Sequence, residues 1–219
     1  MYIDPIEYGR YYHIYNHSVG TRDLFLSEAN YEYFMHLYMR HIVPVADTFA
    51  WAFMKNHFHL LVRLKEEQEL LAVVKMDEKK AARLTVKPSN KNRNLAGNPI
   101  LKSPHLHFSA MFNAYTKAIN KQSGYKGALF RRPMQRKIIN GEDYLKHLVL
   151  YIHNNPIHHG LCEDPHQYPH TSYNSFFTNQ YSFLKWKEVL SWYEDRENFL
   201  QMHHRQIQFE RIEKWLGIY

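Results

Sequence analysis

Two histidines separated by one phenylalanine have a spacing that suggests metal chemistry. His57 and His59 flank Phe58 at the start of segment 57–64, which has the composition of a β-strand. Side chains two positions apart on a strand share a face, so the imidazoles would lie roughly 6–7 Å apart while Phe58 points to the core. Two imidazoles so placed can bind one divalent cation. Because the chain has 16 histidines, a pair on a half-buried strand without function is the alternative.

A tyrosine on a basic helix is the second feature that suggests chemistry. Segment 105–123 has a helical pattern that ends at Gly124, and it carries Tyr115 and Lys117. A phenol can attack phosphorus when it is activated, and nearby cations favour the phenolate. A metal ion on the histidine pair would polarise the scissile phosphate. With 17 tyrosines in the chain, a surface or core aromatic is the competing interpretation.

The elements that must position these residues follow the order strand, helix, strand, strand, helix, strand. We expect strands at 11–18, 45–54, 57–64 and 128–139, and helices at 28–41, 66–83, 105–123 and 143–153. This order predicts an α+β chain with the ferredoxin-like split βαβ fold. Its four-stranded antiparallel sheet would have helices on one face. Asn155 and Pro156 are expected to stop the helix at 143–153 and shape a loop.

The domain organisation follows from a change of composition along the chain. Residues 1–180 are expected to form one domain, with a mobile basic loop at 85–104 that is polar and contains prolines. Helical patterns near 184–204 and 206–216 predict that residues 181–219 form a C-terminal helical extension.

Positive charge is concentrated in the middle of the chain. Residues 75–137 carry 15 Lys and Arg but only two acidic residues, whereas the rest has 13 basic and 19 acidic residues. The net charge of +7 therefore arises entirely from this segment. Such a block favours a large anionic partner, of which nucleic acid is the commonest, over a merely solvated face and loose loop.

Composition excludes several other classes of protein. The 219 residues suit one domain of ordinary size, and 45% hydrophobic residues exclude a disordered chain. Cys162 is the single cysteine, so neither an intrachain disulfide nor a cysteine-based zinc site can form. No apolar run reaches the roughly 18–20 residues of a membrane span, and the N-terminus lacks a signal pattern. We expect a soluble cytoplasmic protein with no membrane partner.

Three segments carry motifs in a fixed order: His-Phe-His at 57–59, Tyr115 within 112–121 followed by 127–132, and Tyr-Ile-His-Asn-Asn-Pro at 151–156. Taken together they resemble the HUH class of single-strand endonucleases, and specifically its REP-associated tyrosine transposase branch. Segment 56–62, Asn-His-Phe-His-Leu-Leu-Val, resembles the His-hydrophobe-His motif. Segments 112–121 and 127–132 resemble the catalytic-helix region of single-tyrosine transposases. Segment 151–161, Tyr-Ile-His-Asn-Asn-Pro-Ile-His-His-Gly-Leu, resembles the branch pattern Tyr-Ile-x-x-Asn-Pro-x-x-x-Gly-Leu.

The resemblance implies a ferredoxin-like transposase that cuts and rejoins single-stranded DNA beside imperfect hairpins. It implies that Tyr115 becomes linked to the 5′ phosphate and that His57 and His59 bind Mg²⁺ or Mn²⁺. A homodimer is also implied, in which the tyrosine of one subunit serves the histidines of the other. Relatives often supply an amide ligand one helical turn after the tyrosine. Here that position is Ile119, so Asn120 is the nearest substitute.

Basic side chains around the Tyr115 helix and the strand after it are the expected DNA contacts, since guanidinium forks suit phosphates and guanine edges. They are Lys117, Lys121, Arg131, Arg132, Arg136 and Lys137. Lysines and arginines between 75 and 93 would add a mobile basic arm.

Two other functions stay open. One is a domesticated relative that binds hairpin DNA with little or no cleavage, for which Ile119 is a hint. The other is a histidine-rich metal-binding protein or small-molecule enzyme on the same fold, which leaves the central positive charge unexplained.

Overall fold

The computed structural model describes residues 5–86, 100–205 and 209–216. Its strands are β1 (Tyr11–His17), β2 (Ala46–Met54), β3 (His57–Leu64) and β4 (Gln135–Ile139). Its helices are α1 (Glu28–His41), α2 (Glu67–Met76), α3 (Glu78–Leu84), α4 (Pro104–Ser123), α5 (Glu142–His158), the 3₁₀ turn η1 (Pro165–Gln167), α6 (Ser175–Thr178), α7 (Trp186–Trp192), α8 (Arg196–His204) and α9 (Phe209–Leu216). No helix in these ranges is long and apolar enough to cross a membrane.

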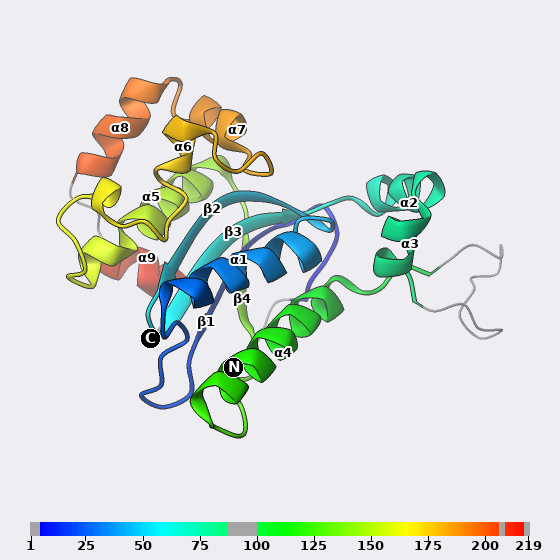
Figure 1. The fold of residues 1–219 in the computed structure, drawn as a ribbon. Helices are drawn as coiled ribbons and strands as arrows, with labels where there is room; N and C mark the ends of the chain where they lie inside the picture. Colours follow the sequence, from blue (N-terminus) through cyan, green and yellow to red (C-terminus); the bar gives the residue numbers. More distant parts are fainter. Residues whose placement is uncertain (1–4, 87–99, 206–208, 217–219) are drawn as a thin grey trace.

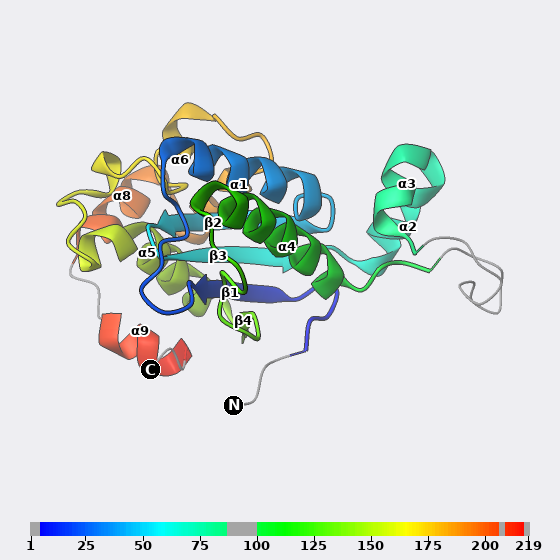
Figure 2. The same cartoon turned by 60° about the horizontal axis from the view of Figure 1, so that its bottom comes forward.

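The four strands form one antiparallel sheet in the order β2-β3-β1-β4. The two inner strands are paired so that His17 lies opposite His57 and Tyr15 lies opposite His59. This is the strand order of the split βαβ arrangement, so the predicted fold class is confirmed. Figures 1 and 2 show the sheet from two directions, with α2 and α3 standing away from it.

Helices α1 and α4 cover the first face of the sheet. Phe58 of β3 packs there against Phe34 of α1 and Phe112 of α4, with ring centroids 5.4 and 5.6 Å apart. The stripe of buried side chains on α4 repeats at helical spacing, as expected for a helix that packs on a sheet. Phe58 therefore points into the core, as the alternation along β3 predicts.

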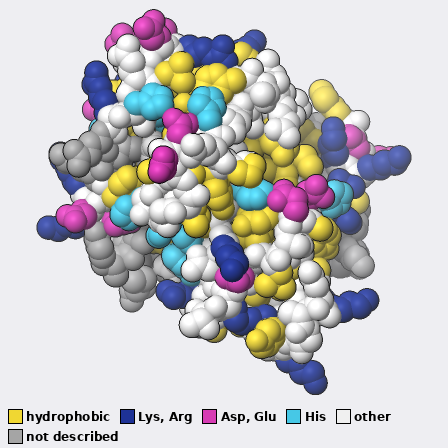
Figure 3. Space-filling model, turned by 60° about the vertical axis from the view of Figure 1, so that its left-hand side comes forward, with side chains coloured by type: hydrophobic (Ala, Val, Ile, Leu, Met, Phe, Trp, Pro, Cys, Tyr) yellow, Lys and Arg dark blue, Asp and Glu magenta, His cyan; other side chains and the backbone are white. Residues whose placement is uncertain are grey.

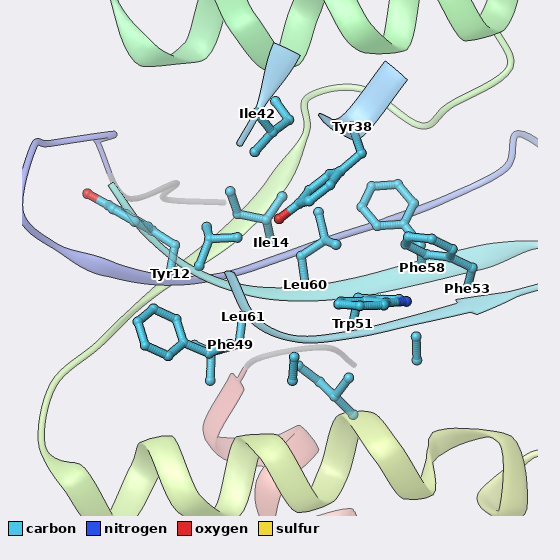
Figure 4. Close-up of a cluster of buried hydrophobic side chains, with 14 of the residues drawn as sticks. Tyr12, Ile14, Tyr38, Ile42, Phe49, Trp51, Phe53, Phe58, Leu60 and Leu61 are labelled. Carbon is cyan, nitrogen blue, oxygen red and sulfur yellow. The ribbon is translucent and has the colours of Figure 1, made fainter. Parts of the chain in front are cut away.

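Helix α5 covers the second face, so helices are not confined to one side as the sequence suggested. In Figure 4, Tyr38 and Ile42 lie on one side of the sheet and Phe49 on the other. Phe49 sits where the β2–β3 register shifts, and it stacks on Trp192 of α7 at 5.3 Å. Buried residues of α7, α8 and α9 belong to the same hydrophobic cluster as the sheet. The division at residue 180 stays a prediction.

Three predicted elements differ in extent. The helix expected at 66–83 is two helices, because the Asp77 side chain accepts a hydrogen bond from the Lys80 amide and starts α3. The strand expected at 128–139 is limited to β4. Helix α5 does not stop before Pro156 but continues to His158. A proline in the last turn removes one helical hydrogen bond close to where the helix ends, so the chain continues at small cost.

Most of the loop predicted at 85–104 lies outside the described residues, which omit 87–99. Its two described ends are paired with each other. Thr85 bridges Leu101, and the Val86 amide donates to the Ile100 carbonyl at 3.0 Å. The two described ends of this segment therefore lie side by side next to α3.

Candidate active site

The predicted histidine pair lies on the second face of the sheet, directed toward α5. His57 and His59 are 4% and 2% exposed, and their ring centroids lie 5.3 Å apart with planes at 88°. They share a face, as their spacing on a strand predicts. Their position on an inner strand holds the two rings in a fixed relation.

Helix α5 brings a tyrosine and an amide to the same place. The Tyr151 ring lies 5.4 Å from the His59 ring, and Asn155 Oδ1 lies 3.2 Å from Nε2 of His57. The two α5 residues are four positions apart, so they lie on one face of the helix. All four side chains are buried in the interface between β3 and α5.

Further imidazoles surround the pair. His17 of β1 stacks on His57 with ring centroids 4.7 Å apart, and His159 meets His57 at 4.8 Å. Nε2 of His13, also on β1, lies 2.9 Å from Nδ1 of His59. Three segments of the chain therefore contribute histidines to one cluster.

Burial keeps these imidazoles uncharged at neutral pH. It lowers the pKa of His13 to about 3, and burial together with the neighbouring His17 and His159 lowers the pKa of His57 to about 3. The pKa of His59 is also well below its usual value, chiefly through burial and then through His13 and His57. A neutral imidazole is the form that binds a metal ion, so the electrostatics suit ligation.

The contacts of His57 are compatible with a cation beside its Nε2. Its Nδ1 faces Asn56 Oδ1 at 2.7 Å, and its Nε2 faces Asn155 Oδ1 at 3.2 Å. A neutral imidazole has one N–H, so one of these contacts joins two acceptors. Nδ2 of Asn155 is buried without a partner. Rotation of the Asn155 amide by 180° would satisfy these groups, and so would a divalent cation between His57 Nε2 and the Asn155 oxygen. Two neutral imidazoles and an amide oxygen are donors that a divalent cation accepts, so the residues present fit a metal ion.

The donor set is limited to two imidazoles and one amide oxygen. Among the described residues, no group of three or more His, Cys, Asp or Glu side chains could hold a metal ion. Positions beyond His57, His59 and Asn155 would therefore fall to water or to substrate oxygens, as at catalytic metal sites with open coordination.

Tyr115 does not reach this site, which corrects the assignment made from the sequence. Its ring is 0% exposed on the first face of the sheet, and its hydroxyl donates to the Leu24 carbonyl at 2.8 Å. Phe34 packs on it at 4.9 Å, and burial raises the pKa of its phenol further above the usual range. Because the hydroxyl lies inside the core of its own chain, a second subunit could not use it either.

Asn120 is not placed to bind a metal at the histidines. Its Nδ2 donates to the Gly127 carbonyl at 2.8 Å, and its Oδ1 accepts from Arg22 at 2.9 Å. Both ends of the amide hold the turn after α4. The amide side chain that lies beside the histidines is Asn155, not the predicted Asn120.

The predicted DNA contacts are spread over both faces. Lys117 and Lys121 are exposed on α4, away from the histidines. By strand pairing, Lys137 lies opposite His13 on the second face, and Arg136 lies opposite Ile14 on the first.

Arginines 131 and 132 are exposed at the end of the β1–β3 pair. The Arg131 amide donates to the His17 carbonyl at 2.9 Å, and its guanidinium Nε donates to the Ser18 carbonyl at 3.3 Å. The charge of Arg131 adds to burial in lowering the pKa of His17. Since His17 stacks on His57, Arg131 lies at the edge of the candidate site.

Helix α9 lies over the tyrosine. The Phe209 ring stacks on His158 at 4.2 Å and meets Tyr151 at 5.6 Å, and Glu213 lies 3.6 Å from His158. Burial, and then Glu213, raises the pKa of the Tyr151 phenol, while Asn155 lowers it. Figure 3 views the molecule from a direction in which histidines are visible among both acidic and basic side chains.

Sequence reasoning missed Tyr151, Asn155, His13, His17 and His159. The signal for the first two was present, because they stand four apart in the segment that resembles the transposase branch. Reading Asn155 and Pro156 as a helix stop concealed it.

Paired histidines on a central strand of a ferredoxin-like sheet, facing a tyrosine and an amide on a helix, define the class of site. The chain shares its fold with a solved REP-associated tyrosine transposase bound to a REP hairpin, with a TM-score of 0.52 and 14% identity. The match covers 84% of this chain and 88% of that one, and it confirms the fold implied by the sequence resemblance. No protein-family model matches the chain, and neither does any curated protein at a significant level.

Proposed function

We propose that this protein is a metal-dependent transposase-like enzyme that cuts and rejoins single-stranded DNA beside hairpins, with Tyr151 as the nucleophile. The observation that carries the proposal is the convergence of Tyr151 and Asn155 of α5 on His57 and His59 of β3. The phenol could act as the nucleophile of such a transesterification, and the two neutral imidazoles and the amide oxygen could hold its metal ion.

The reaction would exchange one phosphate ester for another. The Tyr151 oxygen forms a bond to phosphorus while the bond from phosphorus to the 3′ oxygen breaks. The phenol proton is given up and the leaving 3′ oxygen gains one, which leaves a 3′ hydroxyl and a 5′-phosphotyrosine link. Attack by another 3′ hydroxyl on this link reverses the exchange and rejoins DNA.

His57, His59 and Asn155 would hold the cation, either Mg²⁺ or Mn²⁺. When bound, it would polarise the scissile phosphate and stabilise the negative charge that develops on it. The residues themselves orient the reaction: β3 fixes the two imidazoles, and α5 sets the phenol beside His59. All of these groups come from one chain, so the expected homodimer is not needed to complete the site.

Hairpin-forming single-stranded DNA is the partner we propose. The solved structural neighbour is bound to a REP hairpin, and this chain carries its excess positive charge in residues 75–137. Arg131 and Arg132 are exposed and would contact DNA phosphates beside the site, and the half-buried Lys137 lies on the second face opposite His13. Lys117, Lys121 and Arg136 would act on other parts of the DNA.

A hairpin-binding protein with little cleavage activity is the second candidate. The observation that favours it is the cover over Tyr151, which is 2% exposed beneath Phe209. The two candidates share the DNA partner and differ only in whether the phenol reacts.

A covalent-adduct assay separates them. The protein is incubated with Mn²⁺ and a labelled single strand that contains a hairpin, and adducts are resolved under denaturing conditions. The enzyme forms an adduct that is lost in Tyr151→Phe and retained in Tyr115→Phe, and peptide mapping places the nucleotide on Tyr151. No adduct in the wild type, with hairpin affinity intact, would support the binding protein. An adduct that persists in Tyr151→Phe would refute Tyr151 as the nucleophile.

A further inference from the structure

We propose that His13 is a positioning residue that holds His59 in the tautomer able to bind a metal ion through Nε2. The inference rests on the proposed function, because it assigns a partner to one of the two imidazoles of that site. The residues involved lie on neighbouring strands, with β1 and β3 paired side by side.

The geometry of the contact is specific to the two rings. His13 is 0% exposed, and its Nε2 lies 2.9 Å from Nδ1 of His59. The two rings lie nearly parallel, at 12°. Tyr15 stacks on the His13 ring from its own strand at 4.7 Å, which limits rotation of the imidazole. The contact engages one nitrogen of His59 and leaves Nε2 for a ligand.

The direction of this hydrogen bond decides whether His59 can bind a metal. If Nδ1 of His59 donates, its Nε2 carries a free lone pair. If His13 donates instead, the proton of neutral His59 sits on Nε2 and blocks ligation there. Metal-binding histidines commonly use the other ring N–H to hold a partner that fixes the tautomer. Here His13 Nε2 would be the acceptor.

A second observation argues against a purely structural role. Nδ1 of His13 is buried without a hydrogen-bond partner, and it carries the proton of the neutral ring when Nε2 accepts from His59. Buried polar atoms without partners are rare, and an apolar side chain at this position would avoid the cost. Retention of an imidazole is explained if His59 needs an acceptor at its Nδ1.

The chain offers a matched control in a second buried pair. Nε2 of His203 lies 2.9 Å from Nδ1 of His153, which is the same pair of atoms at the same distance. The other ring nitrogen of His153 contacts the Ser172 hydroxyl rather than the candidate site. Substitution of His203 therefore removes an equivalent bond without touching His59.

The test uses the full chain and Mn²⁺ alone, with affinity measured by electron paramagnetic resonance. We expect His13→Phe to weaken Mn²⁺ binding about 10–100-fold, as loss of a partner to a metal-binding histidine generally does. His13→Gln, whose Oε1 can accept from His59, restores much of the affinity. His203→Phe and His203→Gln leave Mn²⁺ affinity unchanged. Circular dichroism and urea unfolding establish that each variant is folded.

A nuclear magnetic resonance measurement reports the tautomer directly. In metal-free protein labelled with ¹⁵N-histidine, His59 carries its proton on Nδ1 in the wild type and in His13→Gln, and on Nε2 in a substantial fraction of His13→Phe. Unchanged Mn²⁺ affinity in folded His13→Phe would overturn the proposal, as would a proton on Nε2 of His59 in the wild type. Absence of Mn²⁺ binding in the wild type would instead refute the metal site itself and, with it, this role of His13.

Discussion

Oδ1 of Asn155 lies 3.2 Å from Nε2 of His57, and this contact joins helix α5 to strand β3 at the candidate site. The relation matters because the neutral His57 ring has one N–H for two amide oxygens, those of Asn56 and Asn155. It also ties the position of Tyr151, one turn earlier on α5, to the strand that carries the histidines.

Removal of the amide oxygen is expected to weaken metal binding. Asn155→Ala deletes one proposed ligand, so Mn²⁺ affinity and metal-dependent cleavage should both fall by at least tenfold. Asn120→Ala serves as the control, because Asn120 holds the turn after α4 and lies away from the histidines. Isothermal titration with Mn²⁺ measures the difference. Equal losses in the two variants would contradict the assignment of Asn155.

Tyr115→Phe is expected to affect stability rather than chemistry. The substitution leaves the buried Leu24 carbonyl without its donor, at a cost of about 1–2 kcal/mol in the free energy of unfolding. Urea unfolding measures this cost, and cleavage per folded molecule should stay at the wild-type level. A variant as stable as the wild type but unable to cleave would return Tyr115 to the active site.

The salt dependence of DNA binding should reveal whether Arg131 contacts phosphate. Each phosphate contact contributes to the slope of log affinity against log salt, so Arg131→Gln should reduce that slope by about 1. Lys187→Gln is a suitable control, since Lys187 is also exposed but lies on α7, outside the basic segment. Fluorescence anisotropy with a labelled hairpin between low and moderate salt provides the slopes. An unchanged slope would remove Arg131 from the interface.

Stability is expected to fall steeply in mild acid. The folded pKa of His13, His57 and His203 lies at about 3, below the unfolded value of 6.5, and that of His59 and His153 is lowered as well. The unfolded chain therefore binds more protons between those values, so stability decreases as the pH falls from about 6.5 towards 3. Each such histidine costs up to about 1.4 kcal/mol per pH unit in this range.

Urea unfolding at several pH values measures the effect. His203→Leu should reduce the slope of the free energy of unfolding against pH by the contribution of one histidine. A free energy of unfolding that stays constant between pH 6.5 and 4.5 would contradict the lowered pKa values.

Loosening α9 should increase cleavage. Phe209 and Glu213 hold this helix over Tyr151 and His158, and the helix rests beside a cavity of about 630 Å³ lined by side chains of α5, α8 and α9. Phe209→Ala combined with Glu213→Gln weakens that hold and removes the charge that adds to burial in raising the pKa of the Tyr151 phenol. We expect a several-fold faster formation of the covalent adduct.

Lys214→Gln, an exposed position on the same helix, should leave the rate unchanged. A double variant no faster than the wild type would show that α9 does not limit access.

The sheet and the histidine pair could be predicted from the sequence because both depend on local patterns. Alternation along β3 and the short turn before it place His57 and His59 on one face. The choice of tyrosine depended on packing that no local pattern expresses. Tyr115 stands one turn after Met111 and one turn before Ile119, within the apolar stripe of α4. It is buried against the sheet together with the other residues of that stripe. The lysines of the same helix had instead suggested an accessible, reactive phenol.

Helix α5 was harder to predict because a general rule failed there. Prolines usually end helices, but Pro156 sits in the last turn and α5 runs past it, which carries Asn155 onto the helix face that meets His57. The strands could be predicted from the sequence, but the face of the sheet that α5 covers could not. The candidate active site lies on that face, where Tyr151 and Asn155 of α5 meet the two histidines of β3.

The length of the turn between β2 and β3 determines which side chains of β3 point to each face of the sheet. Successive side chains of β3 point to opposite faces of the sheet. Phe58 packs among the aromatic side chains under α1 and α4, whereas His57 and His59 face α5. One residue inserted after Asn56 would move each of these side chains to the other face of the sheet. The imidazoles would then be buried in the hydrophobic core, and the Phe58 ring would occupy the proposed metal site. The length of that two-residue turn is therefore as restrictive as the identity of the histidines that follow it.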